Sequence, residues 1–144
     1  MSCNANGAAI QTMETVNDAV LHQLMRAATD ASRNAYAPYS KFAVGAACVS
    51  SDGRIFSGAN VENASYGLTI CAERNAVFQA VAAGARTIRA LALYTPTPTP
   101  VTPCGACRQV LCEFGTDISI HCCCNGPDIL RFTSGQLLPA AFRL

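Results

Sequence analysis

Two short motifs bring together side chains that can bind a metal ion and move a proton. Cys71-x-Glu73 places a carboxylate two residues from a thiol, and Cys104-x-x-Cys107 supplies two further thiols. Both motifs stand where we expect helices to begin, and the positive partial charge of a helix N-terminus favours thiolates. Three thiolates without an obvious fourth ligand are typical of a catalytic zinc site, which keeps one tetrahedral position for water.

The charge of such a site needs an offsetting cation. Three thiolates on a divalent ion leave a net charge of about −1, which weakens the ion as a Lewis acid. The two helix N-termini offset part of this charge, and we expect Arg74 to lie against a ligating sulfur. The carboxylate of Glu73 can face water on the metal without coordinating the metal, which is the position that a proton shuttle requires.

Each motif alone has simpler interpretations. Free cysteines are often buried packing residues, and Cys104-x-x-Cys107 could form a redox pair. The nine cysteines are an odd number, so a disulfide framework is not expected. His22 and His121 are expected at the surface or with satisfied hydrogen bonds, and not as ligands. Six cysteines outside the motifs are assigned to packing, since the run 122–124 follows a strand and must alternate between faces: Cys3, Cys48, Cys112, Cys122, Cys123 and Cys124.

Size and composition exclude several classes of protein. A chain of 144 residues is long enough for one well-filled core, and 51% apolar against 13% charged residues excludes disorder and favours an oligomer. The net charge of +1 gives no basic field for a nucleic acid polymer. No apolar run is long enough to span a membrane, and residues 1–9 lack the features of a signal peptide, so we expect a cytoplasmic protein with no membrane contact.

The hydrophobic pattern predicts one three-layer α/β domain over residues 15–144, after a flexible N-terminal segment, 1–14. Parallel strands are expected to be joined by the middle helices. The Thr-Pro alternation of 95–103 predicts an extended surface loop. The predicted elements are a helix from Thr15 that stops before Pro38, a hairpin of strands 42–49 and 55–61, a helix from Cys71 to about Gly84, a strand 88–94, a helix 104–114, short strands 118–122 and 129–133, and a C-terminal piece 136–142.

The two cysteine motifs together match the three-cysteine form of the signature of zinc-dependent deaminases. Further stretches extend this match from about Thr15 to the C-terminus, and the chain closely resembles the small homotetrameric cytidine deaminases. The matching stretches are SKFAVGAA at 40–47, NVENASY at 60–66, CAER at 71–74, PCGACRQ at 103–109 and LLP at 137–139.

The resemblance implies the α/β/α cytidine deaminase fold, a five-stranded mixed sheet with helices on both faces. It also implies hydrolytic deamination of cytidine and 2′-deoxycytidine to uridine and 2′-deoxyuridine plus ammonia, in pyrimidine salvage. Cys71, Cys104 and Cys107 would bind one Zn²⁺ per chain, and Glu73 would be the proton shuttle while zinc-bound hydroxide attacks C4.

The same resemblance implies a set of substrate-binding residues. Asn60 and Glu62 match the ribose contacts of the family, and an amide with a carboxylate suits a pair of sugar hydroxyls. Taken without the resemblance, Asn60 could cap a loop and Glu62 could be a solvated charge. The remaining members are Phe42 and Tyr66, which line the nucleoside pocket, Ala72, and Phe142, which reaches the site of a neighbouring subunit.

Three other functions stay open at this point. Blasticidin S deaminase shares the zinc motifs, but the stretch 60–66 resembles a nucleoside reader. A polynucleotide-editing deaminase lacks support because the chain has no basic aromatic surface. A non-enzymatic zinc module would need no carboxylate such as Glu73 beside an open fourth position.

Overall fold

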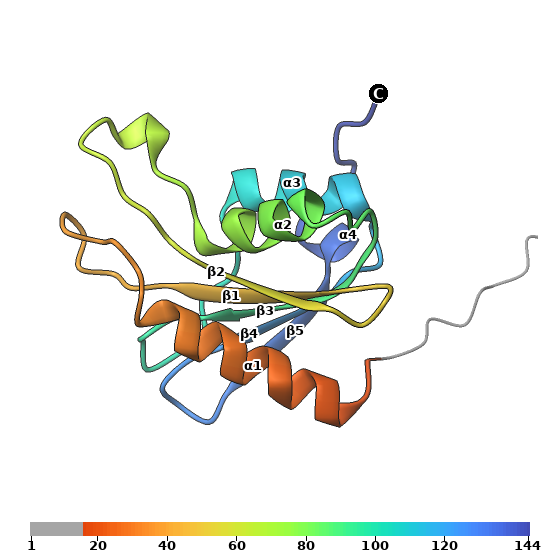
Figure 1. The fold of residues 1–144 in the computed structure, drawn as a ribbon, viewed down its shortest axis with the longest axis horizontal. Coiled ribbons are helices and arrows are strands. Elements are labelled where there is room, and N and C mark those ends of the chain that lie inside the picture. Colours follow the sequence, from red (N-terminus) through yellow and green to blue (C-terminus); the bar gives the residue numbers. More distant parts are fainter. Residues whose placement is uncertain (1–15) are drawn as a thin grey trace, which may run out of the picture.

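The computed structural model describes residues 16–144, and these form a five-stranded mixed sheet between two helical layers (Figure 1). The strand order is β2-β1-β3-β4-β5, so the fold class expected from the sequence is confirmed. The predicted N-terminal segment 1–14, with Cys3, lies outside the described residues. The elements are α1 (Asp18–Ser32), β1 (Gly45–Ser50), β2 (Ile55–Ala59), a 3-10 turn η1 (Tyr66–Leu68), α2 (Ala72–Ala82), β3 (Ile88–Tyr94), α3 (Gly105–Phe114), β4 (Ser119–Cys123), β5 (Ile129–Thr133) and α4 (Ser134–Leu137).

Two helical crossovers give the sheet its mixed topology. The hairpin strands β1 and β2 are antiparallel, and β1 also pairs antiparallel with β3. Thus α2 connects two strands, β2 and β3, that run in the same direction on either side of β1. The next helix, α3, connects β3 to its parallel neighbour β4, and β5 returns antiparallel to β4. The expected joining of parallel strands by the middle helices is therefore confirmed.

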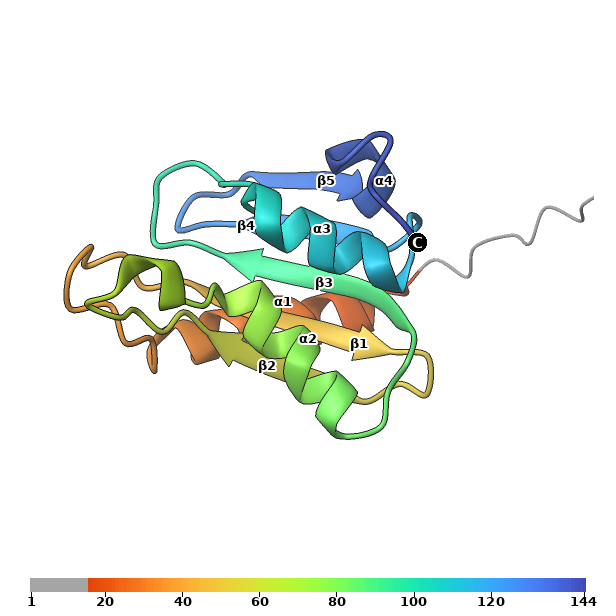
Figure 2. The same ribbon diagram turned by 90° about the horizontal axis from the view of Figure 1, so that it is seen from above.

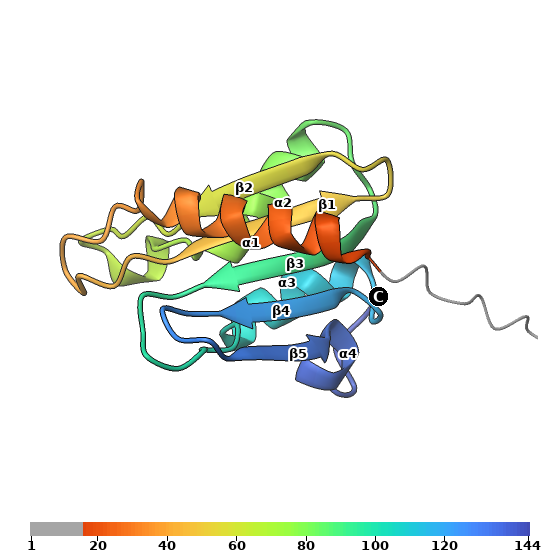
Figure 3. The same cartoon turned by 90° about the horizontal axis from the view of Figure 1, so that it is seen from below.

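The helix α1 covers one face of the sheet over β1, β2 and β3 (Figure 3). The side chain of Asn17 caps it by accepting a hydrogen bond from the Val20 N–H at 2.9 Å. Leu24 and Ala28 are fully buried against the sheet. The approach is close at Gly45, where a Cβ atom would lie 1.9 Å from the Ala28 carbonyl oxygen, so this position requires glycine.

The helices α2 and α3 lie side by side on the opposite face (Figure 2), over the larger of two apolar clusters. Val77 of α2 and Leu111 of α3 meet Leu91 and Ile120 of the two central parallel strands. This packing fixes the N-termini of α2 and α3 close to one another above the sheet (Figure 2). No helix within residues 16–144 combines the length and the apolar character that crossing a membrane requires.

Three predicted boundaries were wrong. The first hairpin strand starts at Gly45 and not at residue 42, because the Val44 N–H donates to the side chain of Asn60. The second ends at Ala59, because Val61 forms a backbone bridge with Ile70. The C-terminal piece is helical only over the single turn of α4, and the chain after it has no regular structure.

Candidate active site

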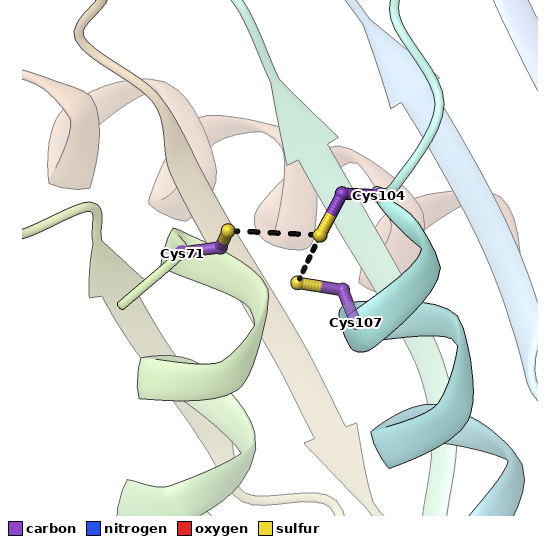
Figure 4. Close-up of side chains that lie close together, drawn as sticks. All are labelled: Cys71, Cys104 and Cys107. Atoms are coloured by element: carbon purple, nitrogen blue, oxygen red, sulfur yellow. Dashed lines mark hydrogen bonds between the residues drawn. The ribbon is translucent and has the colours of Figure 1, made fainter. Parts of the chain in front are cut away.

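The three thiols of the sequence motifs meet between the N-termini of α2 and α3 (Figure 4). Cys71 is the N-cap residue of α2 and Cys104 is the N-cap residue of α3, while Cys107 lies one turn into α3. N-cap positions usually carry a side chain that bonds the helix backbone, but neither cysteine does so. Neither Sγ atom is therefore used to cap its own helix.

The spacing of the sulfur atoms fits a tetrahedral zinc ion. Zinc–thiolate bonds of about 2.3 Å in a tetrahedron place the sulfurs about 3.8 Å apart. The Sγ atoms of Cys71 and Cys104 are 3.8 Å apart, those of Cys104 and Cys107 are 3.5 Å apart, and all three lie within 4.8 Å of one another. Within residues 16–144 no fourth His, Cys, Asp or Glu donor joins the group.

Arg74 is the cation beside this cluster. Its Nη2 donates to the Thr69 carbonyl at 3.2 Å and to the Cys71 Sγ at 3.5 Å. The hydrogen bond with the Cys107 thiol is the largest cause that holds the pKa of Cys71 well below its usual range, and Arg74 lowers that pKa further. The hydrogen bond between the Cys71 and Cys107 thiols, together with burial, raises the pKa of Cys107.

Glu73 lies in the first turn of α2 and is only 4% exposed. Burial is the main cause that raises the pKa of the Glu73 carboxyl group to about 7, and a hydrogen bond with the Cys107 thiol partly opposes this rise. A buried acid without a cation in direct contact can hold or release a proton near neutral pH. Its carboxylate is not part of the three-thiol group.

A cavity of about 220 Å³ opens onto the cluster. Its walls include Cys71, Cys104 and Glu73 on one side. Four of the predicted substrate residues line it as well: Phe42, Asn60, Glu62 and Ala72. The fold thus brings two of the three thiols, the buried acid and these four residues around one space.

Asn60 and Glu62 also hold the segment in front of the cavity in place. The Asn60 Oδ1 accepts from the Val44 N–H at 2.8 Å, and its Nδ2 donates to the Phe42 carbonyl at 2.9 Å. The Glu62 carboxylate accepts from the Tyr39 N–H at 2.8 Å, the Ser40 N–H at 3.2 Å and the Ser40 hydroxyl. Chiefly through the hydroxyl of Ser40, these bonds lower the pKa of Glu62 and keep it charged.

Two predicted aromatic residues lie outside this cavity. Tyr66 is 76% exposed and lines an adjoining hollow, where its ring meets Tyr39 edge to face. Phe142 is 70% exposed and lines another hollow with Gln109 and Arg143. A single chain therefore does not use either ring to enclose the space above the thiols.

The other cysteines pack as predicted where the structure describes them. Cys48, Cys112 and Cys122 are fully buried, and Cys123 and Cys124 point to different partners along the chain. His22 is exposed, as expected. The expectation for His121 was only half right: the ring is buried on an interior strand, and its Nε2 meets Ser119, but its Nδ1 meets no hydrogen-bond partner among residues 16–144.

The sequence analysis missed the part played by the Thr-Pro loop. Both ends of the loop are buried at Thr95 and Pro103, so it is a surface loop only in its middle. Thr95, Val101 and Thr102 line the cavity. One signal was available in the sequence. Thr102 and Pro103 directly precede Cys104, so a site that contains Cys104 must also have these two residues close to it.

Comparisons with known proteins agree with this geometry. Residues 19–123 match the family model of the cytidine and deoxycytidylate deaminase zinc-binding region. A cytidine deaminase of Halalkalibacterium halodurans is 48% identical over 120 residues, which cover 83% of this chain and 91% of that protein. The crystal structure of cytidine deaminase from Burkholderia pseudomallei has a TM-score of 0.81 and 50% identity, and covers 84% of this chain and 98% of that one. Cytidine deaminase from Mycobacterium tuberculosis has a TM-score of 0.77 and 43% identity, covering 90% of this chain and all of that one. The chain belongs to the cytidine deaminase family of enzymes.

Proposed function

We propose that this protein is a zinc-dependent cytidine deaminase, which hydrolyses cytidine and 2′-deoxycytidine to uridine and 2′-deoxyuridine with release of ammonia. The observation that carries the proposal is the placement of a buried carboxyl group, Glu73, beside a three-thiol cluster at the wall of one cavity. Names of similar proteins at 48% and 50% identity support the same substrate.

Cys71, Cys104 and Cys107 would hold one zinc ion per chain. When bound, the ion supplies Lewis-acid activation of water. Glu73 takes a proton from the attacking water, passes it to N3 of the cytosine ring and then delivers a proton to the departing amino group. The water contributes its oxygen to C4 of the product, one of its hydrogens ends on N3 of the ring, and the other leaves with the amino group as ammonia. Burial of Glu73 keeps bulk water from competing for these protons.

Four residues of the same chain would select the nucleoside. The Glu62 carboxylate and the remaining Nδ2 hydrogen of Asn60 would bind sugar hydroxyls, and the Phe42 ring would pack against the substrate, since all three residues line the cavity. Ala72 begins α2, so its backbone N–H has no helical partner and is free for an acceptor on the base. These contacts would make cytidine a better substrate than free cytosine.

We further propose a homotetramer in which Phe142 completes the site of a neighbouring subunit, with Tyr66 near the same boundary. Both rings are largely exposed in the single chain, and neither lines the cavity of its own chain. An exposed ring of this size is stabilised when a partner covers it. The proposed place of the enzyme is pyrimidine salvage in the cytoplasm, with a nucleoside as its small-molecule partner and without nucleic acid polymers.

An absorbance assay on cytidine, 2′-deoxycytidine, cytosine and blasticidin S tests the proposal. We expect both nucleosides to be converted and cytosine to react far more slowly, because it has no sugar for Glu62 and Asn60 to bind. Conversion of blasticidin S alone would replace the proposal with its nearest rival, and no conversion of any compound by the zinc-loaded protein would reject it.

A further inference from the structure

Arg108 lies in α3 and connects this helix to the end of the Thr-Pro loop and to the turn α4. Its Nε donates to the Pro103 carbonyl at 2.7 Å, its Nη2 to the Thr102 hydroxyl oxygen at 2.9 Å and its Nη1 to the Leu137 carbonyl at 3.0 Å. A guanidinium group presents its donors in a rigid plane and stays charged, so three simultaneous bonds fix the relative positions of their acceptors.

Two of these acceptors belong to the catalytic side of the molecule. Pro103 directly precedes Cys104, and the backbone N–H of Arg108 bonds the Cys104 carbonyl at 3.0 Å. Arg108 therefore holds the chain on both sides of the Cys104 α-carbon. Thr102 lines the cavity next to Cys104. Arg108 also directly follows Cys107 in α3. Its position is therefore linked to both cysteines of the Cys-x-x-Cys pair and to the part of the cavity wall that Thr102 forms.

The third acceptor belongs to the C-terminal part of the chain. Leu137 is the last residue of α4, and its carbonyl has no helical partner of its own. The bond from Arg108 satisfies this group and ties α4 to the loop that enters the site. A second link, from Gln109 Nε2 to the Phe142 carbonyl at 2.9 Å, attaches the following tail to the same helix.

We propose that Arg108 is a positioning residue, which sets the place of the Cys104 thiol and of the Thr102 wall for zinc binding and deamination. The proposal deepens the proposed function and rests on it for the part that concerns turnover. Its part that concerns zinc is independent of any substrate, because the thiols bind the ion whether or not cytidine is deaminated.

The first test replaces Arg108 with lysine, which keeps the charge but cannot donate along the same three directions. Residues that orient metal ligands typically change metal affinity or activity by about 10- to 100-fold when they are replaced. We expect Arg108→Lys to lose about tenfold or more in zinc affinity against a chromogenic chelator, and a similar factor in kcat/KM for cytidine at saturating zinc. The matched control is Arg26→Lys, an exposed position on α1 far from the thiols, which should change neither value.

A purely structural role would lower the melting temperature of Arg108→Lys and leave zinc affinity and zinc-saturated kcat/KM within about twofold of the natural protein. That outcome would overturn the proposal. If the zinc-loaded natural protein deaminates no nucleoside, the proposed function fails, but the chelator competition still supports or overturns the role of Arg108.

A second pair of variants keeps the test decisive if Arg108→Lys folds poorly. Thr102→Val preserves the shape of the side chain but removes the oxygen that accepts from Arg108, whereas Thr102→Ser retains that oxygen. We expect the valine variant to lose kcat/KM and the serine variant to recover most of it. In a double-mutant cycle, Arg108→Lys with Thr102→Val should cost no more than the larger single change. Equal effects of valine and serine, or additive losses in the cycle, would contradict the link.

Discussion

Replacing Asn60 with alanine should destabilise the protein even when no substrate is present. The change leaves the buried Val44 N–H and the Phe42 carbonyl without their hydrogen-bond partners. A buried backbone group that loses its partner costs about 1–3 kcal/mol, and the Phe42 carbonyl costs less because water can reach it in part. The two losses together give an expected decrease of roughly 2–4 kcal/mol in the free energy of unfolding.

Urea unfolding at equilibrium measures this decrease. Asn60→Asp is the informative companion variant, because its carboxylate still accepts from the Val44 N–H but can no longer donate to the Phe42 carbonyl. At neutral pH it should lose at least as much stability as Asn60→Ala, because its charge is buried beside the Phe42 carbonyl oxygen; at acid pH it should lose less, because the protonated carboxyl group can donate to that oxygen. The exposed Asn34 on the loop after α1 provides the control, since Asn34→Ala should stay within about 0.5 kcal/mol of the natural protein. If Asn60→Ala also stays within that range, the two bonds do not hold the segment in front of the cavity.

Three further substitutions separate the proposed roles within the site. Glu73→Gln should keep zinc and fold but lose roughly 10²- to 10⁴-fold in kcat, as measured by the change in cytidine absorbance, and near-normal turnover would remove Glu73 from the proton transfer. Glu62→Ala should lower kcat/KM for cytidine by about tenfold, because a charge-assisted bond to the sugar is lost, and an unchanged ratio of cytidine to cytosine turnover would reject this role. Phe142→Ala should lower kcat/KM by about tenfold, and co-refolding it with Glu73→Ala subunits should restore activity above the sum of the two variants, because some mixed sites regain both groups. If mixed assemblies are shown to form and activity does not recover, Phe142 acts only within its own subunit.

The elements that carry a local signal were predicted well. The apolar spacing that begins at Val20 predicted α1. The helix buries three residues of that pattern together with Ser32: Leu21, Leu24 and Ala28. The placement of Cys71 and Cys104 at two helix starts was also correct, because the preceding loops and the following apolar patterns mark those starts within a few residues. Local pattern is sufficient in these cases, since the side chains involved lie on a single element.

Features that depend on contacts between distant segments were not predicted. Residues 42–44 have the composition of a strand, but the side chain of Asn60 replaces strand pairing there. The apolar spacing along the chain contains no information about that bond. No helix was predicted near the C-terminus, although Thr133 and Gln136 form a capping box whose residue types were visible in the sequence.

The candidate site shows the same division between local and distant features. The residues proposed for metal binding and proton transfer lie within two short motifs, so this chemistry could be proposed from residue type and spacing. The cavity wall at Thr95 and Thr102 and the bonds of Arg108 to Pro103 and Leu137 join segments that are far apart or lack a pattern. Only the folded arrangement reveals that the guanidinium group relates the loop, the helix and the C-terminal turn.

The most direct test is a zinc titration of the metal-free protein in which the rate of cytidine conversion is measured at each addition. It asks whether the three thiols hold an ion that deamination requires. The rate should rise in proportion to added zinc and level off at one ion per chain, and Cys104→Ser should show no such rise. Full activity in the metal-free protein, or an unchanged titration in Cys104→Ser, would contradict the assignment of Cys71, Cys104 and Cys107 as the ligands of a catalytic metal.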